Sequence, residues 1–524
     1  MLGGAAVDYY QQESQESDDI FNAADFFIRQ CNLNINREAK TVFYNNNKIY
    51  TYAELEAIVN KYSCKFLDMG LKKKQRIGIL LSDMPQFIFA FWGAIQVGVV
   101  PVLINVKLSK EDIIYIINES EIKLLITEKQ FETIIDLSEN APLEKIILVK
   151  HLEMLTENST NIQSLPKITT TRDEVAFWIY TSGSNGRPKG VMHRHGSMAK
   201  CVDYYGRKTL GLNENDIVYS VSKMAHSYGL GNTTFHTLAV GAASVISNGE
   251  TAFEVVETIN KYKPTVFFAV PSVYASLLRI GDIEQICTES IRLCVSAGEV
   301  LPKSLWYRWK ERFGLEIIDG MGTTESLTTF ISNPIGAVRP GSTGKLVYGF
   351  DAKIVDEENK LVPNGIVGDL LVSGDTFMQG YWCSEENQKR MVGTYFKTGD
   401  KFYMDESGYF WYAGRSIDVF KVNGRWVKAS EIENILLDYT KIKETVVISE
   451  ISENETTKII AYIVIDNAIE ASQELAEDIK RYVKSKLEHF KCPARIHFVT
   501  GIPKGPTSKI RRVKLREELI IFTV

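Results

Sequence analysis

The eleven residues from Tyr180 to Gly190 read YTSGSNGRPKG, and an apolar run that begins at Val175 leads into them. This pattern predicts a buried strand that ends in a turn rich in glycine and hydroxyl residues. Glycines let neighbouring backbone N–H groups point toward one spot, and hydroxyls and cations add donors, so the turn is a candidate cradle for phosphate. An ordinary surface loop has a similar composition. The turn alone leaves both interpretations open.

Strands and helices alternate on both sides of this turn. Before it, we predict strands at 42–44, 49–50, 76–81, 124–126 and 146–149. After it, we predict strands at 217–219, 243–246, 266–270 and 291–295. Thr51 and Glu54 form a capping box that starts a helix reaching Gly70. Strands separated by helices favour mostly parallel sheets that are covered on both faces.

The pattern of residue types along the sequence changes twice toward its C-terminus. After about residue 335, glycines and prolines punctuate short strands, which predicts a small β-rich subdomain. Past Gly414, helices at 431–437 and 475–487 alternate with strands at 445–448 and 459–465, as in a small α+β unit. The predicted fold class is therefore α/β: a large N-terminal domain of mostly parallel βαβ sheets with a β-rich subdomain, then a small α+β domain.

Composition narrows the class of protein. The chain has 524 residues, 45% of them hydrophobic, and a formal charge of −5, which argues against a surface made for nucleic acid or anionic membrane. Its seven cysteines show no CxxC or Cys/His spacing, so we expect buried free thiols in a reducing compartment. The start of the chain has no secretory pattern, and the longest apolar stretch, 87–104, is interrupted by Gly98 and Pro101. We expect a cytoplasmic protein without a membrane span.

The turn at Tyr180 does not match the Walker pattern GxxxxGK[ST], but it resembles the signature loop of the adenylate-forming superfamily. That superfamily includes acyl-CoA synthetases, peptide-synthetase adenylation domains and luciferases. Further segments that resemble its motifs follow in the order that the family requires: Ser296–Glu299, Gly320–Glu325 with Met321 where Tyr is frequent, Thr398–Asp400 with Gly414–Arg415, and Pro503–Ile510. The resemblance covers nearly the whole chain after residue 21. It implies an extension at 1–20, an adenylate-forming domain at 21–415 and a mobile C-terminal domain at 416–524, joined by a hinge.

Within the superfamily, three segments resemble benzoate-CoA ligases: Asn22–Phe27, Ala90–Ala94 and Tyr228–Asn232. The resemblance implies that a benzoate-type acid reacts with ATP and Mg²⁺ to give an acyl-adenylate and pyrophosphate. The acyl group then passes to a thiol, either that of CoA or the phosphopantetheine of an acyl carrier protein. It gives no oligomeric state.

The resemblance also assigns roles to residues. The β and γ phosphates would be held by Thr181, Ser182, Gly183, Ser184 and Lys189. The rest of the nucleotide would contact Ser296, Ala297, Gly298, Glu299, Asp319, Gly320, Met321, Gly322 and Thr323. Thr324 would donate to the α-phosphate and Asp400 would accept from the ribose, with Arg415 near the ribose and the phosphate. Glu325 would bind Mg²⁺, and Lys509 would bridge the substrate carboxylate and the α-phosphate. Taken singly, these residues also fit solvated lysines, a helix-start acid and a turn aspartate.

The acid and the thiol would be selected elsewhere. His226 would gate the acid pocket toward the thiol tunnel, although a structural histidine fits the sequence equally well. The pocket would be lined by Ser227, Tyr228, Gly229 and Thr328, and the tunnel by Gly424, Arg425 and Trp426. For His193 and His195, which precede a predicted helix, we expect capping or exposure to solvent.

Three departures from the family pattern qualify these assignments. Ile417 replaces the usual hinge aspartate, so the pivot of the hinge can differ. The segment Phe490–Ala494 lacks basic residues directly beside its proline, which weakens the case for CoA and makes a carrier protein the alternative, while the overall resemblance still puts CoA first. Thr328 stands where benzoate-type relatives carry histidine, which suggests room or a hydrogen bond for a hydroxyl or amino substituent on the ring. A luciferase-like oxidase and an inactive binding module are the alternatives from other classes.

Overall fold

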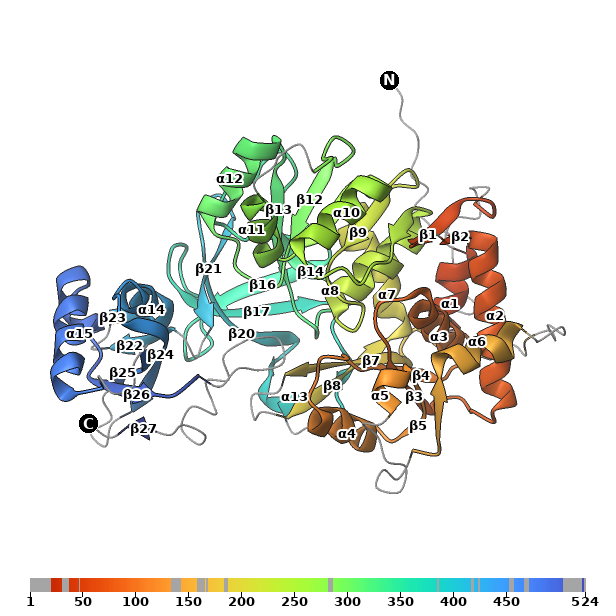
Figure 1. Cartoon of the computed structure of the whole chain (residues 1–524), viewed down its shortest axis with the longest axis horizontal. Helices are drawn as coiled ribbons and strands as arrows, with labels where there is room; N and C mark the ends of the chain where they lie inside the picture. The colour runs from red at the N-terminus through yellow and green to blue at the C-terminus, as the bar shows by residue number, and fades with distance from the viewer. Residues whose placement is uncertain are drawn as a thin grey trace. The chain divides into compact units, whose positions relative to one another are not determined.

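A computed structural model describes residues 20–30, 37–46, 48–132, 143–157, 165, 168–182, 187–280, 286–383, 386–415, 419–422, 425–451, 457–465, 471–502 and 521–522 (Figure 1). The chain divides into two compact units. The first contains 1–181, 189–350 and 374–384, and the second contains 182–188, 351–373 and 385–524. The predicted boundaries at 20/21 and 415/416 stay predictions.

The first unit holds a seven-stranded sheet in the order β18-β8-β7-β4-β3-β5-β6. Its strands are β3 (Arg76–Leu80), β4 (Val100–Leu103), β5 (Ile122–Thr127), β6 (Lys145–Leu148), β7 (Val175–Ser182), β8 (Pro188–Arg194) and β18 (Gly380–Tyr381). From β7 to β6 all neighbours are parallel, whereas β18 runs antiparallel to β8. The predicted turn at Tyr180–Gly190 therefore follows the carboxyl end of a parallel strand, where open α/β sheets bind ligands.

A nine-stranded sheet has the order β15-β14-β13-β12-β11-β9-β10-β1-β2. Its strands are β1 (Thr41–Asn45), β2 (Lys48–Thr51), β9 (Ile217–Ser220), β10 (Ala243–Val245), β11 (Val266–Ala269), β12 (Leu293–Ser296), β13 (Ile317–Gly322), β14 (Thr329–Ser332) and β15 (Lys345–Leu346). The strands from β1 to β13 in this order pair in parallel, and the outer pairs are antiparallel. The predicted strands at 42–44 and 49–50 form the antiparallel pair β1–β2.

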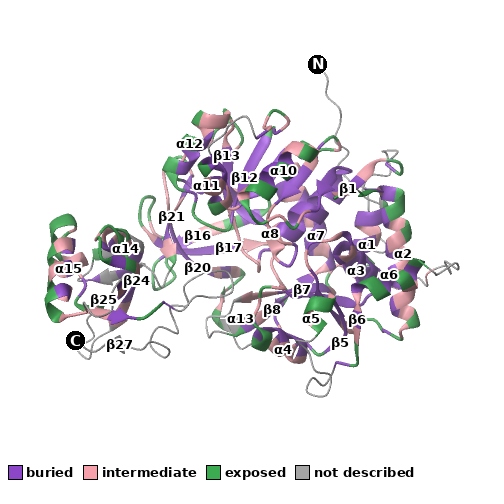
Figure 2. Ribbon diagram, in the orientation of Figure 1, coloured by how far each residue is buried: buried purple, intermediate pink, exposed green. Residues whose placement is uncertain are grey.

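Helices cover these sheets, and Figure 2 shows the strands buried while the outer faces of the helices are exposed. The described helices of the first unit are α1 (Ala23–Asp25), η1 (Phe26–Gln30), α2 (Tyr52–Asp68), α3 (Pro85–Gln96), α4 (Lys110–Glu119), α5 (Lys129–Glu132), α6 (Val149–Glu157), α7 (His195–Cys201), η2 (Val202–Arg207), α8 (Ser227–Leu230), η3 (Gly231–His236), α9 (Thr237–Val240), α10 (Ala252–Tyr262), α11 (Pro271–Arg279) and α12 (Lys303–Phe313). The capping box of Thr51 and Glu54 is present at the start of α2. The largest core joins α2, α3 and η3 to both sheets, with Phe91, Phe177 and Phe235 in mutual ring contact.

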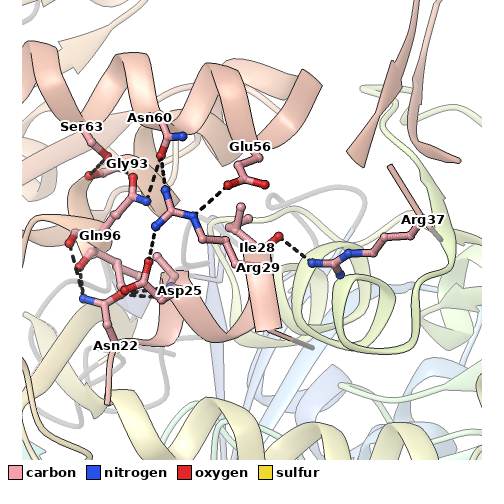
Figure 3. A network of polar contacts seen from close by, with 12 residues as sticks. Asn22, Asp25, Ile28, Arg29, Arg37, Glu56, Asn60, Ser63, Gly93 and Gln96 are labelled. Carbon is pink, nitrogen blue, oxygen red and sulfur yellow. Dashed lines mark hydrogen bonds and ion pairs between the residues drawn. The ribbon is translucent and has the colours of Figure 1, made fainter. Parts of the chain in front are cut away.

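A polar network fastens the first helices to α2 and α3 (Figure 3). Arg29 pairs with Asp25 and Glu56, and its guanidinium also donates to Asn60 Oδ1 at 2.8 Å. Asn22 donates to the Ile95 carbonyl at 2.9 Å and accepts from the Ala24 N–H at 2.9 Å, so it caps α1 while holding it to α3. Side-chain bonds therefore fix this segment against α2 and α3.

The second unit holds a five-stranded sheet, in which β20 pairs antiparallel with β17, β19 and β21, and the small α+β region. The five strands are β16 (Phe350–Val355), β17 (Gly368–Gly374), β19 (Met391–Val392), β20 (Tyr395–Met404) and β21 (Phe410–Arg415). The remaining elements are α13 (Glu386–Lys389), β22 (Val419–Val422), β23 (Arg425–Lys428), α14 (Ala429–Leu437), β24 (Ile442–Ile451), β25 (Thr457–Ile465), α15 (Gln473–Lys486), η6 (His489–Lys491), β26 (Arg495–Val499) and β27 (Ile521–Phe522). The predicted fold class is confirmed.

The described cysteines are free thiols, as expected, but the expectation that they are buried was only partly right. Of the six described cysteines, Cys201 and Cys294 are buried, Cys383 is exposed, and Cys64, Cys287 and Cys492 are half-buried. Helix packing and strand position, which spacing does not reveal, set this exposure. No described helix is both long enough and apolar enough to cross a membrane.

Candidate active site

The glycine-rich turn lies between β7 and β8, and its centre, including Gly183 and Ser184, falls outside the described residues. Thr181 and Lys189 flank it and are half-buried. Ser182 is the last residue of β7. The Lys189 ammonium lies 5.7 Å from the ring centroid of Tyr381 on β18, within the range of a cation–π contact. The predicted phosphate lysine thus lies at the carboxyl end of β7.

A second group of predicted residues lies at the carboxyl ends of β12 and β13. Ser296 and Asp319 are register partners on these parallel strands, and both are buried. Ala297, Gly298 and Glu299 follow β12 directly, and Gly298 has φ +88°, which favours glycine. The Glu299 carboxylate accepts hydrogen bonds from the Ser272 N–H at 3.1 Å and hydroxyl at 3.2 Å, so in this structure it caps α11.

Asp319 has an unusual environment for a carboxyl group. Burial raises its pKa well above the ordinary value, which the Ser296 hydroxyl and the Gly320 N–H offset only in part. Its Oδ1 has no hydrogen-bond partner among the described residues. A buried carboxyl oxygen without a partner among the described residues can bond to a ligand atom, so Asp319 fits a recognition role.

The turn between β13 and β14 carries the predicted Thr324 and Glu325. Ser326 locks it: its hydroxyl accepts from the Thr323 N–H at 2.9 Å and donates to the Thr328 carbonyl at 2.7 Å. Gly322 is required here, because an added Cβ would lie 2.5 Å from the Thr328 oxygen. The Glu325 Oε1 accepts from the Tyr381 hydroxyl at 2.5 Å. The turn therefore presents a carboxylate whose one oxygen is already fixed by a neutral donor.

The predicted acid-binding segment forms a tight loop before α8. The His226 N–H donates to the Lys223 carbonyl at 3.0 Å, and Gly229 packs so closely that an added Cβ would lie 2.2 Å from that carbonyl oxygen. The Asn105 amide nitrogen lies 3.0 Å from His226 Nε2. An amide nitrogen only donates, so His226 Nε2 is the acceptor in this contact. Asn105 thus orients the predicted gate.

The buried side chain of Asp83 is hydrogen-bonded to the backbone of the same loop. Its Oδ1 accepts from the Met224 N–H at 3.0 Å, and its own N–H donates to Asn248 Oδ1 at 2.9 Å. Burial raises the pKa of Asp83 to about 6, while Lys223 and the Met224 N–H act in the opposite direction. Lys223 also donates to the Asn248 carbonyl at 3.2 Å. Sequence reasoning missed Asn105 and Asp83, because neither lies in a recognised motif.

The predicted pocket residues are not uniformly exposed. Ser227 and Tyr228 are half-buried, whereas Gly229 and Thr328 are buried. Tyr228 lies 6.0 Å from Phe268, ring to ring, and its hydroxyl donates to the Val295 carbonyl at 3.4 Å. Burial raises the pKa of Tyr228 well above its ordinary value, so the phenol stays protonated. The Thr328 hydroxyl has no hydrogen-bond partner among the described residues.

In the second unit, Asp400 and Arg415 are cross-strand partners on β20 and β21. The Arg415 Nε lies 2.9 Å from Asp400 Oδ1, and Asp400 is buried. The predicted ribose acid is therefore a fixed carboxylate paired with the predicted arginine. Arg425 on β23 lies over the Phe490 ring at 5.1 Å, and Trp426 is on the same strand. Gly424, Ile417 and the segment with Lys509 lie outside the described residues.

Exposure to solvent, one of the two expectations for His193 and His195, was wrong. Both side chains are buried, and burial lowers the pKa of His193 to about 3 and that of His195 to about 4. His193 stacks on Phe177 at 5.1 Å, and His195 Nδ1 accepts from the Ala23 N–H at 3.1 Å. Their packing partners lie on other elements, which local sequence does not show.

The chemistry of the donors fits a magnesium nucleotide. Among the described residues, no group of three or more His, Cys, Asp or Glu side chains could hold a metal by itself. Mg²⁺ is commonly bound by one or two carboxylates together with the phosphates of its nucleotide, and Glu325 supplies one carboxylate of this kind. A metal at Glu325 would neutralise charge on phosphate oxygens.

The class of protein follows from comparison with known sequences. The family of AMP-binding enzymes matches residues 29–382, and its C-terminal domain matches residues 431–509. The chain belongs to this family of adenylate-forming enzymes, and the predicted resemblance is confirmed.

Individual relatives indicate which branch of the family this chain is similar to. The benzoate–CoA ligase of Thauera aromatica is 35% identical over 95% of this chain and 96% of its own length. The 4-hydroxybenzoate–CoA/benzoate–CoA ligase of Rhodopseudomonas palustris is 33% identical over 95% and 94%. Among solved structures, an anthranilate CoA ligase in complex with anthranoyl-AMP has a TM-score of 0.82 at 34% identity, covering 95% of this chain and 97% of that one.

Proposed function

We propose that this protein is an acid–thiol ligase that activates an aromatic carboxylic acid with ATP and transfers it to CoA. A carboxylate oxygen bonds to the α-phosphorus of ATP, and the bond to pyrophosphate breaks. The thiol sulfur then bonds to the acyl carbon of the adenylate, and AMP leaves with the bridging oxygen. The relatives named above, which act on benzoate-type acids and match nearly full length, support this proposal.

In the structure, the proposal is supported by two charged side chains that contact the same tyrosine. The Lys189 ammonium and the Glu325 carboxylate, which are far apart in the sequence, both contact Tyr381. Tyr381 on β18 therefore contacts both a cation suited to phosphate oxygens and a carboxylate suited to Mg²⁺. Phosphoryl transfer needs mainly positioning and charge stabilisation, and these two groups supply both.

The remaining roles are assigned by the family resemblance. Thr181, Ser182, Gly183 and Ser184 join Lys189 at the β and γ phosphates, Thr324 donates to the α-phosphate, and the segments 296–299 and 319–323 contact the nucleotide. Asp400, which is fixed by Arg415, accepts from the ribose hydroxyls. Lys509 lowers the repulsion between the substrate carboxylate and the α-phosphate as these two anions meet.

For the acid, we propose a benzoate with a hydroxyl or amino substituent. The Thr328 hydroxyl is buried and has no hydrogen-bond partner among the described residues, which is costly unless a ligand or water bonds to it. His226, oriented by Asn105, is proposed to separate this pocket from the thiol tunnel at Gly424, Arg425 and Trp426.

A carrier protein is the second candidate for the thiol acceptor. Lys491, the one basic residue in the segment Phe490–Ala494, has its ammonium 2.8 Å from Glu431 and 2.7 Å from Glu488. Both contacts compete with any phosphate of CoA. The protein is proposed to act in the cytoplasm, where ATP and CoA are available.

The test is acid-dependent ATP–pyrophosphate exchange with benzoate, hydroxybenzoates, aminobenzoates and aliphatic acids. We expect exchange with aromatic acids, and the mass of an acyl-CoA when CoA is added. Exchange driven only by aliphatic acids would refute the acid class. Acylation of a holo carrier protein in preference to CoA would establish the second candidate. Oxygen-dependent consumption of the adenylate would indicate an oxidase, and complete absence of exchange an inactive module.

A further inference from the structure

We propose that Tyr381 is a positioning residue that sets the metal affinity of the adenylation site, an inference that rests on the proposed function. Tyr381 follows Gly380 on the two-residue strand β18 and is buried. It lies in none of the motifs from which the sequence predicted the site. Its side chain nevertheless contacts one predicted residue from each of two such motifs, Lys189 and Glu325.

The backbone around Tyr381 joins these two motifs. On one side, β18 pairs with β8, with Tyr381 opposite Val191, and the Trp382 N–H donates to the Gly190 carbonyl at 2.9 Å. Gly190 is the last residue of the glycine-rich turn. On the other side, the Met378 N–H donates to the Glu325 carbonyl at 2.7 Å, and the Thr376 hydroxyl donates to the Ser326 carbonyl at 2.8 Å. The segment Thr376–Trp382 is thus hydrogen-bonded to both motifs at once.

The hydroxyl of Tyr381 acts on Glu325 in a specific way. A hydrogen bond to one oxygen of a carboxylate restrains the rotation of the group, so the other oxygen keeps a fixed direction toward a bound metal. The Tyr381 hydroxyl donates to Glu325 Oε1 at 2.5 Å, a short bond of the kind that a charged acceptor makes. Partners of this kind orient a metal ligand, and their removal typically weakens metal binding about 10- to 100-fold.

Removing only the hydroxyl separates this role from packing. Tyr381→Phe keeps the ring beside Lys189 and keeps the pairing of β18 with β8. We expect about 10- to 100-fold weaker binding of Mn²⁺ in the presence of ATP, measured from the electron paramagnetic resonance signal of free Mn²⁺. Binding of ATP without metal, and the melting temperature, should change little. Saturating Mg²⁺ should restore ATP–pyrophosphate exchange.

The matched control is Tyr395→Phe, which removes another tyrosine–carboxylate hydrogen bond, to Asp351, on the exposed surface of the second unit. Its Mn²⁺ affinity should equal that of the wild type. Glu325→Gln tests the route of the effect: adding Tyr381→Phe to it should weaken Mn²⁺ binding by much less than Tyr381→Phe does alone.

Three results would overturn the inference. They are an unchanged Mn²⁺ affinity in Tyr381→Phe, a loss of exchange that saturating Mg²⁺ does not restore, and an additive effect with Glu325→Gln. Failure of the proposed function looks different: the wild-type protein itself would then show no acid-dependent exchange at any Mg²⁺ concentration.

Discussion

Asp83→Asn should make the stability of the folded protein less dependent on pH, because Asp83 is a buried acid that contacts the loop carrying His226. Asp83 is buried behind this loop and accepts from the Met224 N–H at 3.0 Å. Burial raises its pKa from 3.8 to about 6. The folded protein therefore binds this proton more tightly than the unfolded chain does. The resulting stabilisation is complete below pH 3.8 and is lost as the pH rises through about 6.

The magnitude follows from the size of the shift. The difference between 3.8 and about 6 corresponds to about 3 kcal/mol, the cost of keeping Asp83 ionised at neutral pH. Asparagine carries no such charge, and its side-chain oxygen can accept the same bond from Met224. Lys223 keeps its contacts with Asn248 and Glu250. At about pH 5 only about half of this stabilisation is present, so between about pH 5 and about pH 7.5 the variant should gain about 1.4 kcal/mol relative to the wild type.

The assay compares melting temperatures of the wild type and the variant at both pH values. The wild type should lose about two degrees more than Asp83→Asn does on going to the higher pH. Asp173→Asn, at an exposed carboxylate, is the control and should behave as the wild type. Equal pH dependence in wild type and variant would refute the reasoning. Asp83→Ala, which removes the acceptor, should raise KM for the acid about tenfold and change KM for ATP less.

Three further predictions concern the reaction itself. Lys509→Ala should abolish adenylation but leave thioester formation from supplied acyl-AMP largely intact; equal loss of both steps in rapid-quench assays would contradict the role of Lys509. Gly229→Ala should raise KM for the acid at least tenfold, because its Cβ would lie 2.2 Å from the Lys223 carbonyl oxygen; an unchanged KM would show that the loop can shift. Thr328→Val should lower kcat/KM for hydroxybenzoates or aminobenzoates about tenfold relative to benzoate, and an unchanged ratio would remove Thr328 from substituent recognition.

The elements of the fold could be predicted because their signals are local. The capping box of Thr51 and Glu54 starts α2 as expected, and the apolar run from Val175 forms β7. The break at Gly98 in the long apolar stretch separates α3 from β4, as the sequence predicted. Periodicity and turn residues carry this information within a few positions of each other.

The partners of the site residues could not be predicted, because they come from distant parts of the chain. Asn105 contacts His226 across 121 positions, and Tyr381 contacts Glu325 across 56. His195 was expected to cap a helix or face solvent, but it accepts a hydrogen bond from Ala23, 172 positions away. Motifs identify the groups that react, whereas tertiary packing chooses the groups that hold them in place.

The central claim, that the acid is activated as an acyl-adenylate, is tested most directly with an aromatic acid labelled with ¹⁸O in its carboxylate. If a carboxylate oxygen attacks the α-phosphorus and the thiol later attacks the acyl carbon, that oxygen stays with the nucleotide. We expect AMP with one labelled oxygen and unlabelled pyrophosphate. Unlabelled AMP, or label in pyrophosphate or inorganic phosphate, would contradict it.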